Sequence, residues 1–89
     1  MTKKRRKLNK DFEKEIYTSK KNVELILAKI YDIDDEDIQK EYMSAFNEVV
    51  YTYDQLKNDY ELIGFNDNSK NLIAKYNEAF SLFEAEFEI

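Results

Sequence analysis

Apolar residues recur at helical spacing over the first third of the chain. Successive positions of this face are three or four residues apart. All but Ser19 are apolar, and they are Phe12, Ile16, Ser19, Val23, Ile26 and Ile30. This spacing places them on one face of an α-helix, and Leu8 lies one turn earlier, so we predict a first helix over about residues 8–31. Because Ser19 interrupts the apolar face, a break with a new N-cap at Thr18 or Ser19 is the alternative to a continuous helix.

The same spacing returns in two further stretches. An acidic segment separates the first stretch from the second and supplies N-cap side chains, so a second helix is predicted over about residues 35–63. This helix ends at Gly64, the only glycine in the chain, which is typical of a helix C-terminus. A third helix, capped by Asn68 or Ser69, is predicted over about residues 69–87.

The predicted fold class is all-α. Short connections make consecutive helices antiparallel neighbours, so we predict an up-down-up three-helix bundle with a basic N-terminal arm. Residues 8–89 form a single helical domain in this interpretation, and residues 1–7 form a flexible basic arm. Residues 83–89 alternate apolar and acidic side chains, a pattern typical of a strand. Because the chain offers no second strand, we favour helix there, with addition to a partner's sheet edge as the alternative.

The composition excludes most site chemistry. The chain has no Cys, His, Trp or Pro, which removes disulfides, thiolate and imidazole metal ligands, and Cys or His catalysis. Two acidic stretches do not match the calcium-loop pattern, because its sixth position needs Gly and holds Asp37 in the first stretch and Leu72 in the second. We therefore predict no metal site, no cofactor and no enzymatic activity.

Charge is segregated along the sequence. The formal net charge is −5, but residues 1–31 carry ten Lys and Arg against four Asp and Glu, whereas residues 32–89 carry four against fifteen. In an up-down-up bundle this places a basic arm at one end, formed by Lys3, Lys4, Arg5, Arg6 and Lys7. The opposite end collects the predicted partner-binding acidic residues, which are Asp32, Asp34, Asp35, Glu36, Asp37, Glu84, Glu86 and Glu88.

The hydropathy pattern also bears on the compartment. The longest uninterrupted apolar run is only Leu25-Ile26-Leu27-Ala28, far short of the roughly 20 residues that cross a bilayer. Polar residues follow the basic start where a signal peptide needs its apolar region. The sequence therefore predicts a cytoplasmic protein that does not span a membrane.

These features favour a protein-binding function. A dense group of carboxylates can occupy a basic site on a larger protein, and association of this kind is fast and sensitive to salt. Aromatic residues outside the main apolar faces are candidate contacts that flank the acidic surface, and they are Tyr17, Tyr31, Tyr51 and Phe65. The leading hypothesis is a small inhibitor or adaptor that docks this surface onto a basic site of a larger protein. A homo-oligomer is also compatible with the opposite charges of the two ends.

Two alternatives place the function in the basic arm. Its five consecutive cations can neutralise phosphates, so a small oligomeric regulator that binds nucleic acid nonspecifically is one of them. The other is an immunity-type protein that guards a target at the membrane, with the basic arm contacting anionic lipids. The format, a small helical protein with a cationic start, is similar to bacteriocin immunity proteins and to phage-encoded inhibitors, and the composition resembles that of a low-GC bacterium or its mobile elements. No motif is shared, so no residue role follows from this resemblance.

Overall fold

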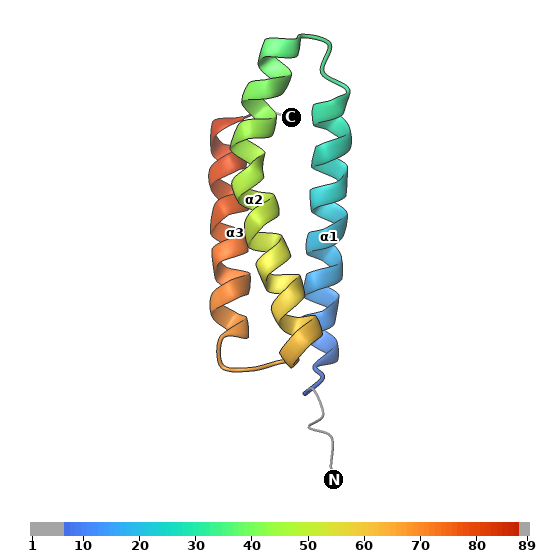
Figure 1. The fold of residues 1–89 in the computed structure, drawn as a ribbon, viewed down its shortest axis with the longest axis vertical. Helices are drawn as coiled ribbons and strands as arrows, with labels where there is room; N and C mark the ends of the chain where they lie inside the picture. Colours follow the sequence, from blue (N-terminus) through green and yellow to red (C-terminus); the bar gives the residue numbers. More distant parts are fainter. Residues whose placement is uncertain (1–6, 88–89) are drawn as a thin grey trace.

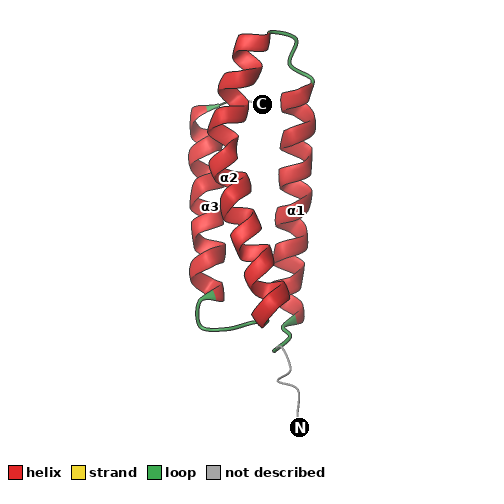
Figure 2. Cartoon of the chain, viewed as in Figure 1, coloured by secondary structure: helices red, strands yellow, loops and turns green. Residues whose placement is uncertain are grey.

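The computed structural model describes residues 7–87 of the chain. Its elements are α1 (Lys10–Tyr31), α2 (Glu36–Ile63) and α3 (Ser69–Glu86), so the all-α prediction is confirmed. Figures 1 and 2 show α2 between the other two helices, with the chain reversing direction at each of the two connections. Lys3, Lys4, Arg5 and Arg6 of the predicted arm, and Glu88 of the predicted acidic surface, lie outside the described residues.

The first helix begins two residues later than the pattern predicts, because Asn9 caps it. The Asn9 side chain accepts a hydrogen bond from the Phe12 N–H at 2.9 Å, and its own N–H donates to the Tyr60 hydroxyl at 3.0 Å. The helix then continues through Ser19 without a break, since the Ser19 hydroxyl donates to the Glu15 carbonyl at 2.8 Å within the same helix. The continuous-helix interpretation is therefore the one that the structure shows.

A backbone contact involves Lys7, the last residue of the predicted basic arm. Its carbonyl accepts a hydrogen bond from the Phe65 N–H at 2.6 Å, and Lys7 and Gly64 form a parallel β-bridge. The periodicity gave no sign of this contact, because it joins two backbones that are far apart in sequence. Lys7, the first described residue, is thus tied to the connection between α2 and α3.

That connection is organised by the side chain of Asn66. Its amide donates to the Gly64 carbonyl and to Asp59, both at 2.8 Å, and its oxygen accepts from the Asn68 N–H at 2.8 Å. Asn68 occupies the N-cap position of α3 but makes no capping bond through its side chain, and the Ser69 hydroxyl instead accepts from the Asn66 N–H at 3.0 Å. The helix start was predicted, but Asn66 supplies the side-chain bonds that hold it.

The alternating segment over residues 83–89 is helical as far as Glu86. Residues from Phe83 to Glu86 belong to α3, and Phe87 adopts an extended conformation. Phe83 and Phe87 nevertheless share one environment, since their rings stack with centroids 5.1 Å apart. Within the described residues the strand alternative does not hold.

The hydrophobic core follows the central helix. Phe46, Val49 and Leu56 of α2 and Ile30 of α1 are almost completely buried. Edge-to-face aromatic contacts join α2 to α3, and their centroid distances are 4.8 Å for Phe46–Phe83, 6.5 Å for Phe46–Phe80, 6.2 Å for Tyr53–Tyr76 and 4.8 Å for Tyr42–Phe87. Such geometry contributes about 0.5–1.5 kcal/mol per pair beyond burial, so α3 is held to α2 chiefly by aromatic rings.

Two buried tyrosines make the stability of the fold decrease as the pH rises into the alkaline range. Burial raises the pKa of Tyr53, and the carboxylates of Asp54, Glu24 and Glu61 raise it further. Burial also raises the pKa of Tyr76, against the lowering effect of its hydrogen bond to Ser19. A raised tyrosine pKa means that the folded state holds the proton more tightly than the unfolded state. The stability that this difference contributes is fully present below about pH 10, the ordinary pKa of tyrosine. It is lost as the pH rises through the raised pKa values of the folded state.

We expect the urea midpoint of unfolding to fall between pH 8 and pH 11, and to fall less in the double variant Tyr53→Phe/Tyr76→Phe. Because phenylalanine does not titrate, the variant removes the difference in proton binding between the two states. Replacing the exposed Tyr31 by Phe controls for the loss of a hydroxyl. If the urea midpoint falls equally with pH in the double variant and the wild type, Tyr53 and Tyr76 are not the cause of the pH dependence.

Candidate functional site

The predicted acidic residues of the first connection form a fixed, exposed loop. Asp35 caps α2, and its carboxylate accepts hydrogen bonds from the N–H groups of Asp37 at 2.9 Å and Ile38 at 3.1 Å. The Gln39 side chain donates to the carbonyls of Ile30 and Tyr31, both at 3.1 Å, and so secures the end of α1. We call this surface the acidic loop, and its carboxylates belong to Asp32, Asp34, Asp35, Glu36 and Asp37.

The carboxylates of the acidic loop have no cationic partner in the described part of the chain. All five residues are exposed, and the salt bridge found among residues 7–87 joins Lys21 to Glu24 at 3.9 Å on α1. Asp35 is occupied by its capping bonds, whereas the other four carboxylates face solvent. The loop therefore presents uncompensated negative charge on a rigid backbone, which is the arrangement that strengthens attraction to a cationic surface.

The two other described acidic candidates, Glu84 and Glu86, lie at the same end of the bundle but further from its tip than the acidic loop. The ring of Phe87, just after α3, contacts Tyr42 of α2, and Tyr42 follows Glu36 by six residues, or about 9 Å along the axis. Figure 1 shows the same offset, with the end of α3 short of the first connection. Glu84 and Glu86 therefore lie nearer the middle of the molecule than the acidic loop, which projects past the end of α3.

The four aromatic candidates do not gather around the acidic loop. Tyr31 adjoins Asp32 and is 69% exposed, so it is the one that flanks the acids. Tyr17 lies about 21 Å further back along α1, where the Lys21 ammonium sits 5.3 Å from its ring centroid. Tyr51 lies midway along α2 and accepts a hydrogen bond from Gln55 at 2.9 Å. Phe65 is at the opposite end of the molecule, packed on Phe12 with centroids 5.1 Å apart.

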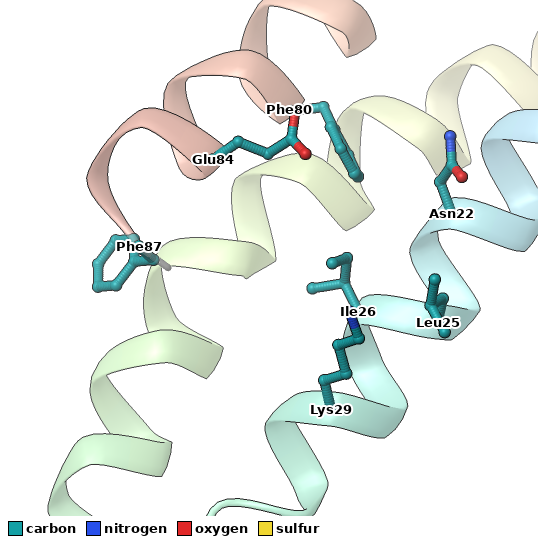
Figure 3. Close-up of a pocket in the computed structure, with 7 residues that line it drawn as sticks. All are labelled: Asn22, Leu25, Ile26, Lys29, Phe80, Glu84 and Phe87. Atoms are coloured by element: carbon teal, nitrogen blue, oxygen red, sulfur yellow. The ribbon is translucent and has the colours of Figure 1, made fainter. Parts of the chain in front are cut away.

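A groove between α1 and α3 is the feature that the sequence patterns did not reveal. It has a volume of about 700 Å³ and lies beside the α2 helix (Figure 3). Side chains from the two outer helices line it: Asn22, Leu25, Ile26 and Lys29 of α1, and Phe80, Glu84 and Phe87 at the end of α3. Leu25 is 55% exposed, and Phe80 and Phe87 are half-buried, so apolar surface faces solvent here. We call this feature the α1–α3 groove.

The groove exists because both outer helices pack on α2 and scarcely on each other. One hydrogen bond between them, from the Tyr76 hydroxyl to the Ser19 carbonyl at 3.3 Å, lies nearer the opposite end. A smaller cavity of about 280 Å³ is lined by both residues of that bond and shares Asn22 with the groove. The apolar run around Leu25 was the available signal, because it widens the face of α1 beyond what a single neighbouring helix covers.

The described residues offer neither a metal centre nor a bilayer-crossing helix. Between Lys7 and Phe87 no three carboxylates come together in a way that would hold a metal ion, and the chain has no His or Cys. None of the helices over the same range combines the length and the hydropathy that crossing a bilayer requires. The sequence matches no protein-family model, and neither a curated protein nor a solved structure is significantly similar to it.

Proposed function

We propose that this chain is a non-enzymatic protein-binding module, an inhibitor or adaptor, that docks its acidic loop onto a basic surface of a larger protein in the cytoplasm. The framework of the proposal is an up-down-up three-helix bundle with a basic N-terminal arm at the end opposite the acidic loop. The observation that supports it best is the acidic loop itself, in which five exposed carboxylates project about 9 Å past the end of α3 without a cationic partner among residues 7–87.

The backbone of the loop is what suits these carboxylates to recognition. Since Asp35 and Gln39 fix the connection by hydrogen bonds, little conformational entropy remains to be lost when a partner binds. The projection past α3 lets the loop enter a concave basic site ahead of the rest of the bundle. Tyr31, exposed beside Asp32, adds an aromatic group that can cover apolar surface at the edge of such a contact.

The test compares two variants of equal charge. In the loop variant, Asp32→Asn, Asp34→Asn, Glu36→Gln and Asp37→Asn are combined, and Asp35 is kept because it caps α2. The control variant neutralises four exposed carboxylates elsewhere, by Glu48→Gln, Asp54→Asn, Asp67→Asn and Glu78→Gln. Both variants lose the same net charge, so a difference between them reports the position of the charge and not its total.

We expect the loop variant to bind the partner at least about tenfold more weakly, since charge pairs at an interface contribute on the order of 1.5 kcal/mol or more. The measurement is a tagged pull-down from bacterial lysate after nuclease treatment, at moderate and high salt. A protein retained by the wild type and the control variant, released by salt, and lost by the loop variant supports the proposal. Equal retention by both variants, or material that disappears with nuclease, contradicts it.

A further inference from the structure

We infer that the α1–α3 groove receives an amphipathic helix from the partner, with an apolar face toward the groove and Lys or Arg residues toward the acidic loop. This inference rests on the proposed function, because it takes the partner to be a basic protein. It adds a second contact to the acidic loop and specifies the secondary structure that makes this contact.

The lining residues have the spacing of a helix-binding surface. On α1, Asn22, Leu25 and Lys29 follow at steps of three and four. On the other wall, Phe80 and Glu84 of α3 are four residues apart, and Phe87 comes just after the helix. The α1 wall therefore presents about two turns, or about 10 Å, of one helical face, and the α3 wall presents about one turn extended by the Phe87 ring. Figure 3 shows Ile26 and Phe80 directed into the space between the two helices. A helix with apolar residues at positions i, i+3 or i+4, and i+7 matches walls of this length.

The packing of the bundle leaves room for such a helix. The two outer helices both pack on α2 and scarcely contact one another. A fourth helix that lies in the α1–α3 groove, across from α2, would therefore contact both of them. It would cover Leu25, which is 55% exposed, together with the half-buried rings of Phe80 and Phe87. Removing this apolar surface from water favours binding, and the walls already hold their positions through α2.

Charge around the groove selects a basic occupant. Within the groove, Lys29 of α1 and Glu84 of α3 stand on opposite walls. Lys29 lies at the end of the groove nearest the first connection, and beyond it the next charges are acidic: Glu86 on α3 and Asp32 and Asp34 in the acidic loop. A helix that leaves the groove in this direction passes carboxylates, so cations there are favoured. A second copy of this chain is a poorer occupant because it brings a net charge of −5.

The probe is a synthetic peptide of about 18 residues, long enough for helix formation, with Leu at i, i+4 and i+7 and Lys at its polar positions. We expect ¹⁵N-labelled protein titrated with this peptide to show amide shifts at Leu25, Lys29, Glu84 and Phe87. A peptide with Glu in place of Lys should cause no shifts there.

Two leucine variants give a matched comparison. Leu25→Ser should weaken peptide binding about tenfold, the expected result of losing one central apolar contact of about 1.4 kcal/mol. Leu62→Ser, at a leucine that is 80% exposed near the end of α2, should leave the affinity unchanged. Both leucines are exposed, so neither substitution removes a core contact.

The outcomes separate this inference from the proposed function. If the loop variant weakens peptide binding but Leu25→Ser does not, the acidic loop binds cations and the groove inference is overturned. If Leu25→Ser weakens binding and the loop variant does not, the role of the acidic loop fails. If the groove amides show no shifts at about 1 mM peptide, the limit of weak recognition, the inference is overturned. Groove shifts that follow dilution of the protein alone would identify a second copy as the occupant and also overturn it.

Discussion

Replacing Phe46 by alanine is expected to lower the free energy of unfolding by about 3–5 kcal/mol, the cost of removing a large buried ring and leaving a cavity. The Phe46 side chain is 0% exposed and lies at the centre of α2, where its ring contacts Phe80 and Phe83 of α3. A chain of 89 residues has about 4–13 kcal/mol of stability in total. The substitution therefore removes a large part of what keeps the protein folded.

The measurement is thermal unfolding followed by far-ultraviolet circular dichroism. At about 4–8 °C per kcal/mol for a domain of this size, the midpoint should fall by about 12 °C or more. Phe46→Leu keeps most of the volume and provides a folded variant with a smaller loss if the alanine variant does not fold. Leu62→Ala, at an exposed position, is the control and should change the midpoint little. A loss below about 1 kcal/mol at Phe46 would be incompatible with this packing.

Replacing Gly64 by L-alanine is expected to cost about 1–3 kcal/mol, because its backbone lies in a region open essentially to glycine. Gly64 has φ 86° and ψ −165° and ends α2, where its N–H donates to the Tyr60 carbonyl at 2.8 Å. It is also buried, and it pairs with Lys7 across the base of the molecule. An L-side chain there must either strain the backbone or move the connection to α3.

The control for this substitution is D-alanine at the same position, introduced by chemical synthesis of the chain. D-Alanine adds the same methyl group but favours positive φ, so it separates backbone strain from side-chain volume. We expect the D-alanine protein to have a higher urea midpoint than the L-alanine protein. If the two proteins unfold at the same midpoint, strain at Gly64 is not the cause of the loss.

Much of the fold follows from spacing in the sequence. The apolar steps of three and four located the helices, Asp35 marked the start of α2, and Gly64 marked its end. What spacing does not show is side-chain bonding within a connection. Asn66 resembles any other polar turn residue in the sequence, yet its amide and oxygen make three of the hydrogen bonds that hold the turn before α3. Such bonds depend on three-dimensional geometry that local periodicity does not encode.

The candidate site was predicted less completely than the helices. The acidic loop follows from composition, because consecutive carboxylates between two helices can hardly be buried. The positions of the four candidate aromatic residues could not be predicted from composition in this way. Lying outside an apolar face does not say which end of a helix a residue occupies, and only Tyr31 adjoins the acidic loop. The α1–α3 groove depends on how closely the two outer helices approach, which no single helix pattern contains.

The unequal attachment of the outer helices to α2 has a consequence for local unfolding. Aromatic pairs hold α3 to α2 along most of its length. The α1 helix is joined to the rest by Phe12 and hydrogen bonds to Tyr60 at one end, by the Gln39 bonds at the other, and between them by aliphatic contacts and the Tyr76–Ser19 bond. Regions with fewer buried contacts open at lower free energy than the rest of a domain. We therefore expect amide protons of α1 to exchange with solvent through partial openings that leave α2 and α3 packed together, and a ligand that bridges α1 to α3 to slow that exchange.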